Sequence, residues 1–302
     1  MNSKRYSRQT VLPEIGAEGQ RRLDRARILC VGVGGLGSPA ALYLTAAGIG
    51  HIGLIDADRV DVSNLQRQVL FEDADQGLLK VDAAKNRLQR LNPDVEIATY
   101  AEAFNETNAM ALLQNYDLIL DGSDNFETKF LVNDAAYKRG IPVVYAAVNR
   151  FEGQVALFWG NRGSCYRCLY PAPPKAAVRN CAEAGVLGAV VGTMGTLQAT
   201  LALQYFISAA EPRHPLCPQV GALTLFDFAG SWNTTMIDVP KRDRCPTCAR
   251  PPEEITLHCA APACEAIETL SVEELQSLLN KPHEGLLLID VRTHEEWHDG
   301  HI

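Results

Sequence analysis

The sequence contains no run of about twenty consecutive apolar residues, the length that a membrane-spanning helix requires. Its N-terminal stretch, MNSKRYSRQTVLPEIG, also lacks the apolar core of a secretory signal peptide. Acidic residues outnumber basic ones by 36 to 28, so the net charge is −8 and the basic excess of a nucleic-acid or anionic-membrane binder is missing. These absences predict a cytoplasmic protein with no nucleic-acid partner and no membrane partner.

Internal repeats, low-complexity segments and a Walker-type Gly-Lys-Ser/Thr sequence are absent as well. With 302 residues, 47% of them hydrophobic, the chain is long enough for one large domain, or for one domain and part of another. Its nine cysteines are an odd number and include two Cys-x-x-Cys pairs. In a reducing compartment this usage indicates metal or thiol chemistry rather than a disulfide framework.

A glycine-rich turn, Gly32-Val33-Gly34-Gly35-Leu36-Gly37, follows an apolar run and precedes a helix-compatible stretch. Glycines at this spacing let the backbone approach a phosphate, and the free N–H groups at the start of the helix face its charge. The turn therefore predicts a nucleotide site. By itself it leaves NAD and ATP open.

Strand and helix patterns alternate through the first half of the chain, which predicts parallel strands joined by right-handed crossovers. After residue 149 the β-rich runs lack intervening short helices, and we interpret them as antiparallel strands that extend the sheet. The expected fold is α/β, a Rossmann-like, doubly wound, mostly parallel sheet extended by antiparallel strands, with a structural zinc site. The expected strands are 28–33, 51–56, 95–99, 118–121, 142–148, 154–159 and 222–228, and the expected helices are 38–47, 78–91, 106–114, 126–139 and 187–209.

Asp56 ends the second expected strand, where an acidic residue commonly receives the ribose hydroxyls of a nucleotide; the alternative is an ordinary solvated aspartate. Beyond it, Asn64, Arg67 and Lys80 supply donors that can converge on a triphosphate and stabilise a displaced pyrophosphate. A dehydrogenase needs no such cluster, because hydride transfer leaves the pyrophosphate intact, so these residues favour ATP. The same polar stretch contains Asp58 and Ser63-Asn64-Leu65-Gln66-Arg67-Gln68.

The segment Asp121-Gly122-Ser123-Asp124-Asn125 ends an apolar strand, at the edge of the sheet where ligands of open α/β folds bind. Either aspartate can hold Mg²⁺ through oxygen ligands beside substrate phosphates. Capping of the following helix by Asp124 or Asn125 is an equally available interpretation, and both roles can coexist.

The pairs Cys165-x-x-Cys168 and Cys245-x-x-Cys248 supply four thiolates, and a closed four-sulfur site is typical of structural zinc. A thioredoxin-like redox pair is the alternative, but neither pair opens a βαβ unit. A zinc ion would tie the end of the domain to its middle.

Cys181 follows the proline-rich loop 170–174 and precedes the long helix-compatible stretch. A thiol near the start of a helix, with Arg179 close in sequence, can have a lowered pKa and act as a nucleophile. A half-buried small residue is the equally weighted alternative. Cys30, in an apolar strand, is expected to be a core residue.

Together these motifs resemble the ubiquitin-activating-like adenylyltransferases of the MoeB/ThiF family, over about residues 1–250. Residues 5–9 and the region of Cys181 also match the molybdopterin-synthase adenylyltransferase branch. The resemblance implies activation of a ubiquitin-fold sulfur carrier that ends in Gly-Gly: its carboxylate attacks the α-phosphate of Mg-ATP, giving an acyl-adenylate and pyrophosphate. For the pathway it implies molybdenum cofactor synthesis, with thiamine or another thiolated product as the alternative.

The resemblance also implies roles for individual residues. Gly34 and Gly35 approach the nucleotide, Asp56 binds the ribose, and Asp124 holds magnesium. Arg8, which by itself reads as a solvated charge, becomes an arginine finger that reaches the site of the other subunit of a homodimer. The family assigns phosphate contacts to Asn64, Arg67 and Lys80, and in its sulfur-transferring members thiol chemistry to the position of Cys181.

A second resemblance concerns the end of the sequence, where residues 287–302 are similar to the opening of a rhodanese domain. Such domains carry their persulfide cysteine well beyond this point, so the stretch given is not expected to form one. We expect an adenylyltransferase domain at 1–249, a linker at 250–268 and an incomplete rhodanese-like segment at 269–302, poorly ordered unless it packs on the main domain.

Two other classes remain in competition. An NAD-dependent oxidoreductase would share the glycine turn and Asp56, but it leaves Arg67, Lys80 and the four paired cysteines unexplained. A non-catalytic, zinc-stabilised scaffold for a ubiquitin-like partner would have no need of a phosphate and metal site formed by Arg67, Lys80 and Asp124.

Overall fold

The computed structural model describes residues 4–174, 185–230, 232–257 and 276. The chain divides into two compact units, Met1–Pro262 and Ala263–Ile302. Cys181 and nearly all of the second unit, including the expected rhodanese-like segment, lie outside the described residues.

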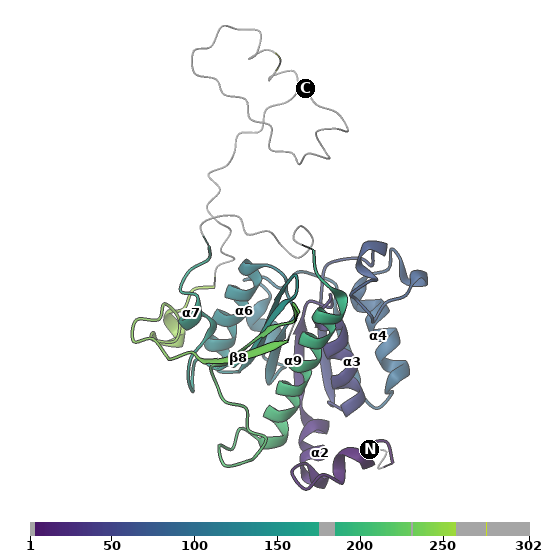
Figure 1. Cartoon of the computed structure of the whole chain (residues 1–302), viewed down its shortest axis with the longest axis horizontal. Helices are drawn as coiled ribbons and strands as arrows, with labels where there is room; N and C mark the ends of the chain where they lie inside the picture. Colours follow the sequence, from purple (N-terminus) through teal and green to yellow (C-terminus); the bar gives the residue numbers. More distant parts are fainter. Residues whose placement is uncertain (1–3, 175–184, 231, 258–275, 277–302) are drawn as a thin grey trace. The chain divides into compact units, whose positions relative to one another are not determined.

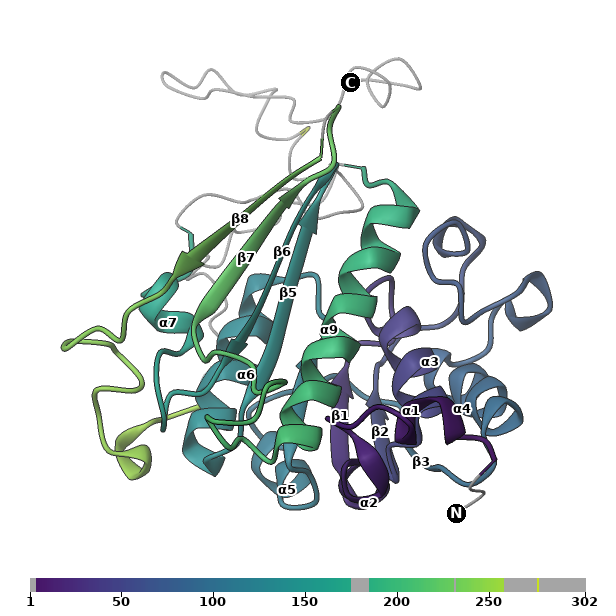
Figure 2. The same cartoon turned by 60° about the horizontal axis from the view of Figure 1, so that its bottom comes forward.

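Within the described residues the first unit is built on an eight-stranded sheet of order β3-β2-β1-β4-β5-β6-β7-β8 (Figures 1 and 2). Strands β1 to β5 are parallel, and β6, β7 and β8 continue the sheet in antiparallel pairing. The predicted fold, a mostly parallel sheet with an antiparallel extension, is confirmed. The strands are β1 (Arg27–Val31), β2 (His51–Ile55), β3 (Glu96–Tyr100), β4 (Leu118–Asp121), β5 (Val143–Asn149), β6 (Glu152–Phe158), β7 (Ala222–Asp227) and β8 (Asn233–Asp238).

Helices cover both faces of the parallel strands, as crossover connections require (Figures 1 and 2). Helices α3, α4 and α9 lie on one face, and α5 and α6 lie on the other. The helices are α1 (Ser7–Thr10), α2 (Gly16–Arg25), α3 (Gly37–Ala47), α4 (Lys80–Leu91), α5 (Ala109–Leu113), α6 (Phe126–Arg139), α7 (Tyr166–Leu169) and α9 (Gly188–Ser208), with short 3-10 turns η1 (Val62–Asn64), η2 (Asp73–Asp75) and η3 (Pro252–Glu254).

Around the parallel strands the core forms two apolar layers, one on each face of the sheet. Alternate residues of β1 point to opposite layers: Ile28 and Cys30 pack with α3 and α4, whereas Leu29 and Val31 pack with α5 and α6. Burial raises the pKa of the Cys30 thiol to about 12. The prediction that Cys30 is a core residue is confirmed.

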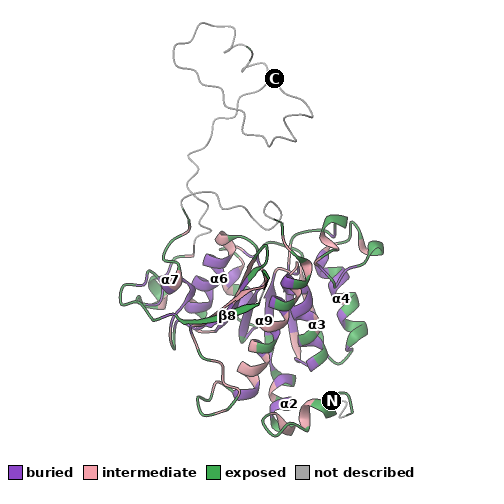
Figure 3. Ribbon diagram, in the orientation of Figure 1, coloured by how far each residue is buried: buried purple, intermediate pink, exposed green. Residues whose placement is uncertain are grey.

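The last strand, β8, and the short helix α7 were not predicted from the sequence. Every residue of β8 is exposed, as Figure 3 shows. A strand with no buried face needs no alternation of apolar and polar residues, and the β8 sequence NTTMID has none. Strand β8 adds to the edge of β7 through antiparallel backbone pairing. Beyond the second cysteine pair the chain stays packed, since Ile255 is buried and Lys138 Nζ donates to its carbonyl at 3.0 Å.

No helix in the described ranges combines the length and the apolar character that crossing a bilayer would take.

Candidate functional site

A cleft of about 1320 Å³ opens at the carboxyl edge of the parallel sheet. It includes the ends of β1 and β4, between which the strand order reverses, and ligands of open α/β sheets bind at such a point. The structure brings together here the glycine turn after β1, the acidic end of β2 and the segment after β4. Of the individually predicted catalytic and nucleotide-binding residues, those lining the cleft are Gly34, Gly35, Asp56, Asp58, Arg67, Gln68, Lys80, Asp124 and Asn125.

The glycine turn is fixed by close packing against the segment after β4. Gly32 has φ +86°, and a Cβ added to it would lie 3.0 Å from the carbonyl oxygen of Gly122. A Cβ on Gly37 would overlap the carbonyl of Gly32. By contrast, a Cβ on Gly34 would meet only Gln68 Nε2, at 3.6 Å, so the backbone here is open to a ligand.

Asp56 connects the turn to the end of β2. Its Oδ2 accepts from the Val33 N–H at 2.8 Å, and its Oδ1 accepts from the Asp58 N–H at 2.9 Å. The half-buried carboxylate therefore faces the cleft while it orders the glycine turn.

Lys80 places a buried ammonium group at the wall of the cleft. It is the first residue of α4 and only 5% exposed, and its Nζ donates to Asp58 Oδ2 at 2.8 Å. The Asp58 side chain is 70% exposed, so one face of this ion pair is accessible to solvent or ligand. The arrangement therefore places a cation in the lining of the cleft, where a bound anion can contact it.

The stretch 63–68 approaches the cleft through its second half. Arg67 and Gln68 line it, and Arg67 Nη1 donates to the Ser63 carbonyl at 3.0 Å. Hydrogen bonds from Ser63 hold the pKa of Asp61 below its ordinary value and fix η1. The other four predicted residues of this stretch do not line the cleft: Ser63, Asn64, Leu65 and Gln66.

The two aspartates after β4 have different environments. Asp121 is buried: its Oδ1 accepts from Ser123 Oγ at 2.5 Å, and its Oδ2 accepts from Lys129 Nζ at 3.1 Å. Asp124 is exposed in the cleft, and within the described part of the chain no donor reaches its carboxylate. Asn125 caps α6 by accepting from the Thr128 N–H at 2.8 Å. Of the two aspartates after β4, Asp124 is therefore the one whose carboxylate is available to a cation.

Lys129 is a residue of the cleft that sequence reasoning missed. Its side chain is 6% exposed, and its Nζ also donates to the Ala146 carbonyl at 2.9 Å, which joins α6 to β5. A lysine in the first turns of a helix usually extends into solvent, and only its spacing of eight from Asp121 could have suggested a partner.

Arg8 is exposed on the short helix α1 (Figure 2). Its neighbour Gln9 donates to the Ala47 carbonyl at the end of α3, whereas α3 begins at the glycine turn. The eleven residues of α3 span about 16 Å. Within one chain Arg8 is thus separated from the cleft by the length of a helix.

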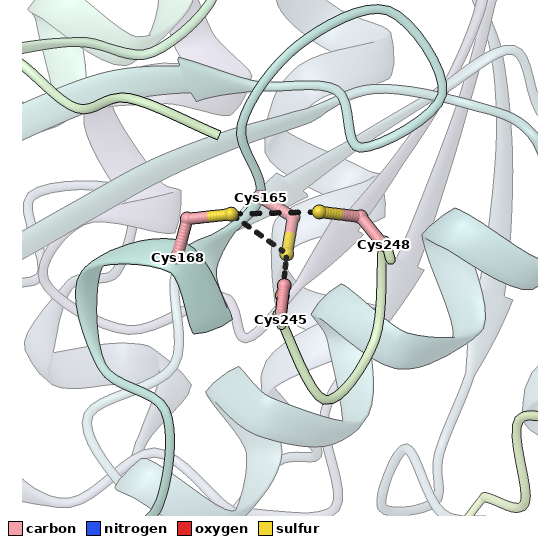
Figure 4. Close-up of side chains that lie close together, drawn as sticks. All are labelled: Cys165, Cys168, Cys245 and Cys248. Atoms are coloured by element: carbon pink, nitrogen blue, oxygen red, sulfur yellow. Dashed lines mark hydrogen bonds between the residues drawn. The ribbon is translucent and has the colours of Figure 1, made fainter. Parts of the chain in front are cut away.

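The four paired cysteines form a compact cluster whose side chains face one another (Figure 4). All four are buried, and their sulfur atoms lie within 4.8 Å of one another. The Cys165–Cys245 and Cys168–Cys248 sulfur distances are 3.5 and 3.4 Å, and the Cys165–Cys168 distance is 4.0 Å. A tetrahedral zinc ion with Zn–S bonds of about 2.3 Å needs sulfur–sulfur edges of about 3.8 Å, so the cluster fits this metal. The metal interpretation, which uses all four sulfurs, is favoured over a redox pair.

Comparison with known proteins gives a family match and close relatives. The profile of the ThiF family matches residues 6–247. A sulfur carrier protein adenylyltransferase of Thermus thermophilus is 45% identical over 256 residues, covering 83% of this chain and 92% of that protein. The adenylyltransferase and sulfurtransferase MOCS3 of Sus scrofa is 42% identical over 309 residues, covering 97% of this chain but only 66% of the relative.

Solved structures with the same fold are more distant in sequence. Escherichia coli MccB, in a crystal structure with ATP, has a TM-score of 0.70 at 22% identity, covering 82% of this chain and 75% of that one. PaaA has a TM-score of 0.63 at 22% identity, covering 80% and 74%. At these identities the likeness shows a shared fold.

Proposed function

The chain belongs to the ThiF family, as its motifs suggested, and from this membership we propose that it adenylates the C-terminal glycine carboxylate of a ubiquitin-fold sulfur carrier. The observation that carries the proposal is the convergence, in one cleft, of an open glycine turn, the cations of Arg67 and Lys80 and the exposed carboxylate of Asp124. The names of the two relatives support it.

In the proposed reaction a carboxylate oxygen of the carrier attacks the α-phosphorus of ATP. An acyl–phosphate bond forms, the bond from the α-phosphorus to its bridging oxygen breaks, and pyrophosphate leaves with the bonding electrons. Negative charge grows on the leaving group, where the Lys80 ammonium and the Arg67 guanidinium stabilise it. The backbone at Gly34 and Gly35 accommodates the phosphates. Asn64, on η1, does not line the cleft, and its proposed role is to contact the phosphates once ATP is bound.

Asp56 orients the nucleotide through the ribose, and Asp124 holds Mg²⁺, which when bound neutralises phosphate charge in the transition state. Asp56 follows β2 and Asp124 lies in the segment after β4, and these two strands flank β1, which leads into the glycine turn. This arrangement positions the sugar and the phosphates at the same time.

The cysteine cluster holds structural zinc in this proposal, with Cys165, Cys168, Cys245 and Cys248 as ligands. Four protein ligands leave the metal no open position for substrate. Its contribution is to stabilise the antiparallel half of the sheet.

The active enzyme is proposed to be a homodimer in which Arg8 reaches the cleft of the partner subunit. The placement of Arg8 supports this to the extent that Arg8, exposed at the far end of α3, does not reach the cleft of its own chain. The proposed pathway is molybdenum cofactor synthesis, on the resemblance of residues 5–9 and the Cys181 region. Carriers for thiamine or thiolated tRNA are the alternatives.

Pyrophosphate exchange tests the proposal directly. We expect a Gly-Gly-terminated carrier to cause exchange of labelled pyrophosphate into ATP, and Asp124→Ala to abolish it. Asp82→Ala is the matched control, because Asp82 is exposed on α4 and does not line the cleft. Absence of exchange with every Gly-Gly carrier tested would contradict the proposal.

A further inference from the structure

We propose that Asp134 is a positioning residue that holds the two Cys-x-x-Cys pairs in register for their metal, an inference that rests on the proposed zinc site. Asp134 lies on α6 and is far in sequence from both pairs. Its carboxylate accepts hydrogen bonds from one residue inside each pair, so it links the two half-sites through their inner residues.

The contacts to the first pair come from Arg167, between Cys165 and Cys168. Its Nε donates to Asp134 Oδ1 at 2.8 Å, and its Nη2 donates to Oδ2 at 2.7 Å. These two bonds fix both the orientation of the Arg167 guanidinium and the distance of the Cys165–Cys168 loop from α6. The Phe130 ring, 4.6 Å from the guanidinium carbon, supports the arginine from the same helix.

The contact to the second pair comes from Thr247, between Cys245 and Cys248. Its Oγ1 donates to Asp134 Oδ1 at 2.6 Å, and the threonine is only 1% exposed. A single carboxylate oxygen thus receives a donor from each half-site. The two loops cannot separate without breaking a bond to Asp134.

Burial makes these bonds strong determinants of the geometry. Asp134 is 5% exposed, and the Arg167 side chain is 15% exposed, so neither charge has ready access to water. Removing one member of such a pair leaves an uncompensated buried charge. The neighbouring Asn133 strengthens the link, because its Oδ1 accepts from the Tyr166 N–H at 2.8 Å.

A site organised before the metal arrives binds it more tightly, because the ligand loops lose less freedom on binding. Helix α6 supplies this order: it packs on the sheet and presents Asp134 and Asn133 to the cysteine loops. Asp134 therefore acts on the metal through the loops, without contacting a sulfur atom.

The test measures metal affinity rather than adenylation. Zinc is titrated against a chromophoric chelator in the full chain, and Co²⁺ replaces it for absorption spectra of the four-sulfur site. We expect Asp134→Asn to lower zinc affinity by about tenfold to 100-fold and to alter the Co²⁺ bands. Thr247→Val, which removes one hydrogen bond and keeps the charges paired, should lower the affinity by a smaller factor and serves if Asp134→Asn does not fold.

Lys138→Met is the matched control. Lys138 lies on the same helix and donates to the Pro252 and Ile255 carbonyls, beyond the cysteine pairs. The Lys138→Met variant should keep the zinc affinity of the parent chain even if the substitution destabilises the fold. Parent-like affinity in Asp134→Asn and Thr247→Val, or an equal loss in Lys138→Met, would overturn the inference. A parent chain that binds no zinc would overturn the zinc proposal with it, whereas failed adenylation would leave the result standing.

Discussion

The carboxylate of Asp56 accepts a hydrogen bond from the Val33 N–H at 2.8 Å, so the residue proposed to bind the ribose also orders the glycine turn. The other carboxylate oxygen accepts from the Asp58 N–H. Binding of the ribose and binding of the phosphates therefore both depend on Asp56, and a substitution there should affect both.

Replacing Asp56 should weaken ATP binding in two ways. Asp56→Ala removes the ribose acceptor and frees the turn, and we expect the Kd for ATP to rise by about 10- to 100-fold, the equivalent of a charged hydrogen bond. Asp56→Asn keeps one acceptor oxygen and should lose less. Calorimetric titration with ATP measures both, with Asp73→Ala, on the exposed turn η2, as the control. An unchanged Kd in Asp56→Ala would contradict the assignment.

From the Lys80–Asp58 pair we expect variants that change the rate of pyrophosphate exchange without changing the affinity for the carrier. Lys80→Met removes a cation proposed to act on the leaving group, and we expect the rate of pyrophosphate exchange to fall by about 10²- to 10³-fold with little change in carrier affinity. Asp58→Asn should cost much less, because that side chain is 70% exposed and its role is to hold Lys80 before ATP arrives. Equal losses in the two variants would show that the pair acts only structurally.

The fold could be predicted from the sequence wherever burial leaves a periodic pattern. Helix α6 has the predicted bounds, and the antiparallel extension follows from the apolar runs of β6 and β7. Strand β8 could not be predicted, since it is exposed along its whole length and forms by pairing with β7. Its sequence therefore has no core-facing side to recognise.

The site was predictable where its residues follow strand ends. Asp56 and Asp124 were located in this way, and the structure places both in the cleft. The partners of buried charges were not predictable: apart from its spacing from Asp121, Lys129 has the sequence context of a solvated helix lysine. The role of Asp134 could not be predicted either, because its partners, Arg167 and Thr247, lie in loops distant in sequence.

The buried Lys129–Asp121 pair predicts a large effect on stability. Lys129→Met leaves the Asp121 carboxylate buried without its cation, and we expect the free energy of unfolding to fall by about 3–5 kcal/mol. Adding Asp121→Asn should recover part of the loss. The exposed Arg21–Glu18 pair provides the control, since Arg21→Met should leave the free energy of unfolding nearly unchanged. Urea unfolding compares the variants, and equal losses at the two positions would show that Lys129 is not held as the structure indicates.

The position of Arg8 predicts complementation between two inactive variants. Arg8→Ala should lose exchange activity while keeping ATP affinity, because its own cleft is intact, and Asp124→Ala should be inactive through its own cleft. In a mixed dimer the Arg8→Ala chain contributes a cleft with Asp124 intact, and the Asp124→Ala chain contributes Arg8 to that cleft. Random exchange should therefore restore about one quarter of the parent activity, since half of the dimers are mixed and each has one working site. Each variant incubated alone is the control, and size-exclusion chromatography of differently tagged chains confirms that subunits exchange. Exchanged dimers without activity, or an active Arg8→Ala chain, would show that Arg8 does not act on the partner's cleft.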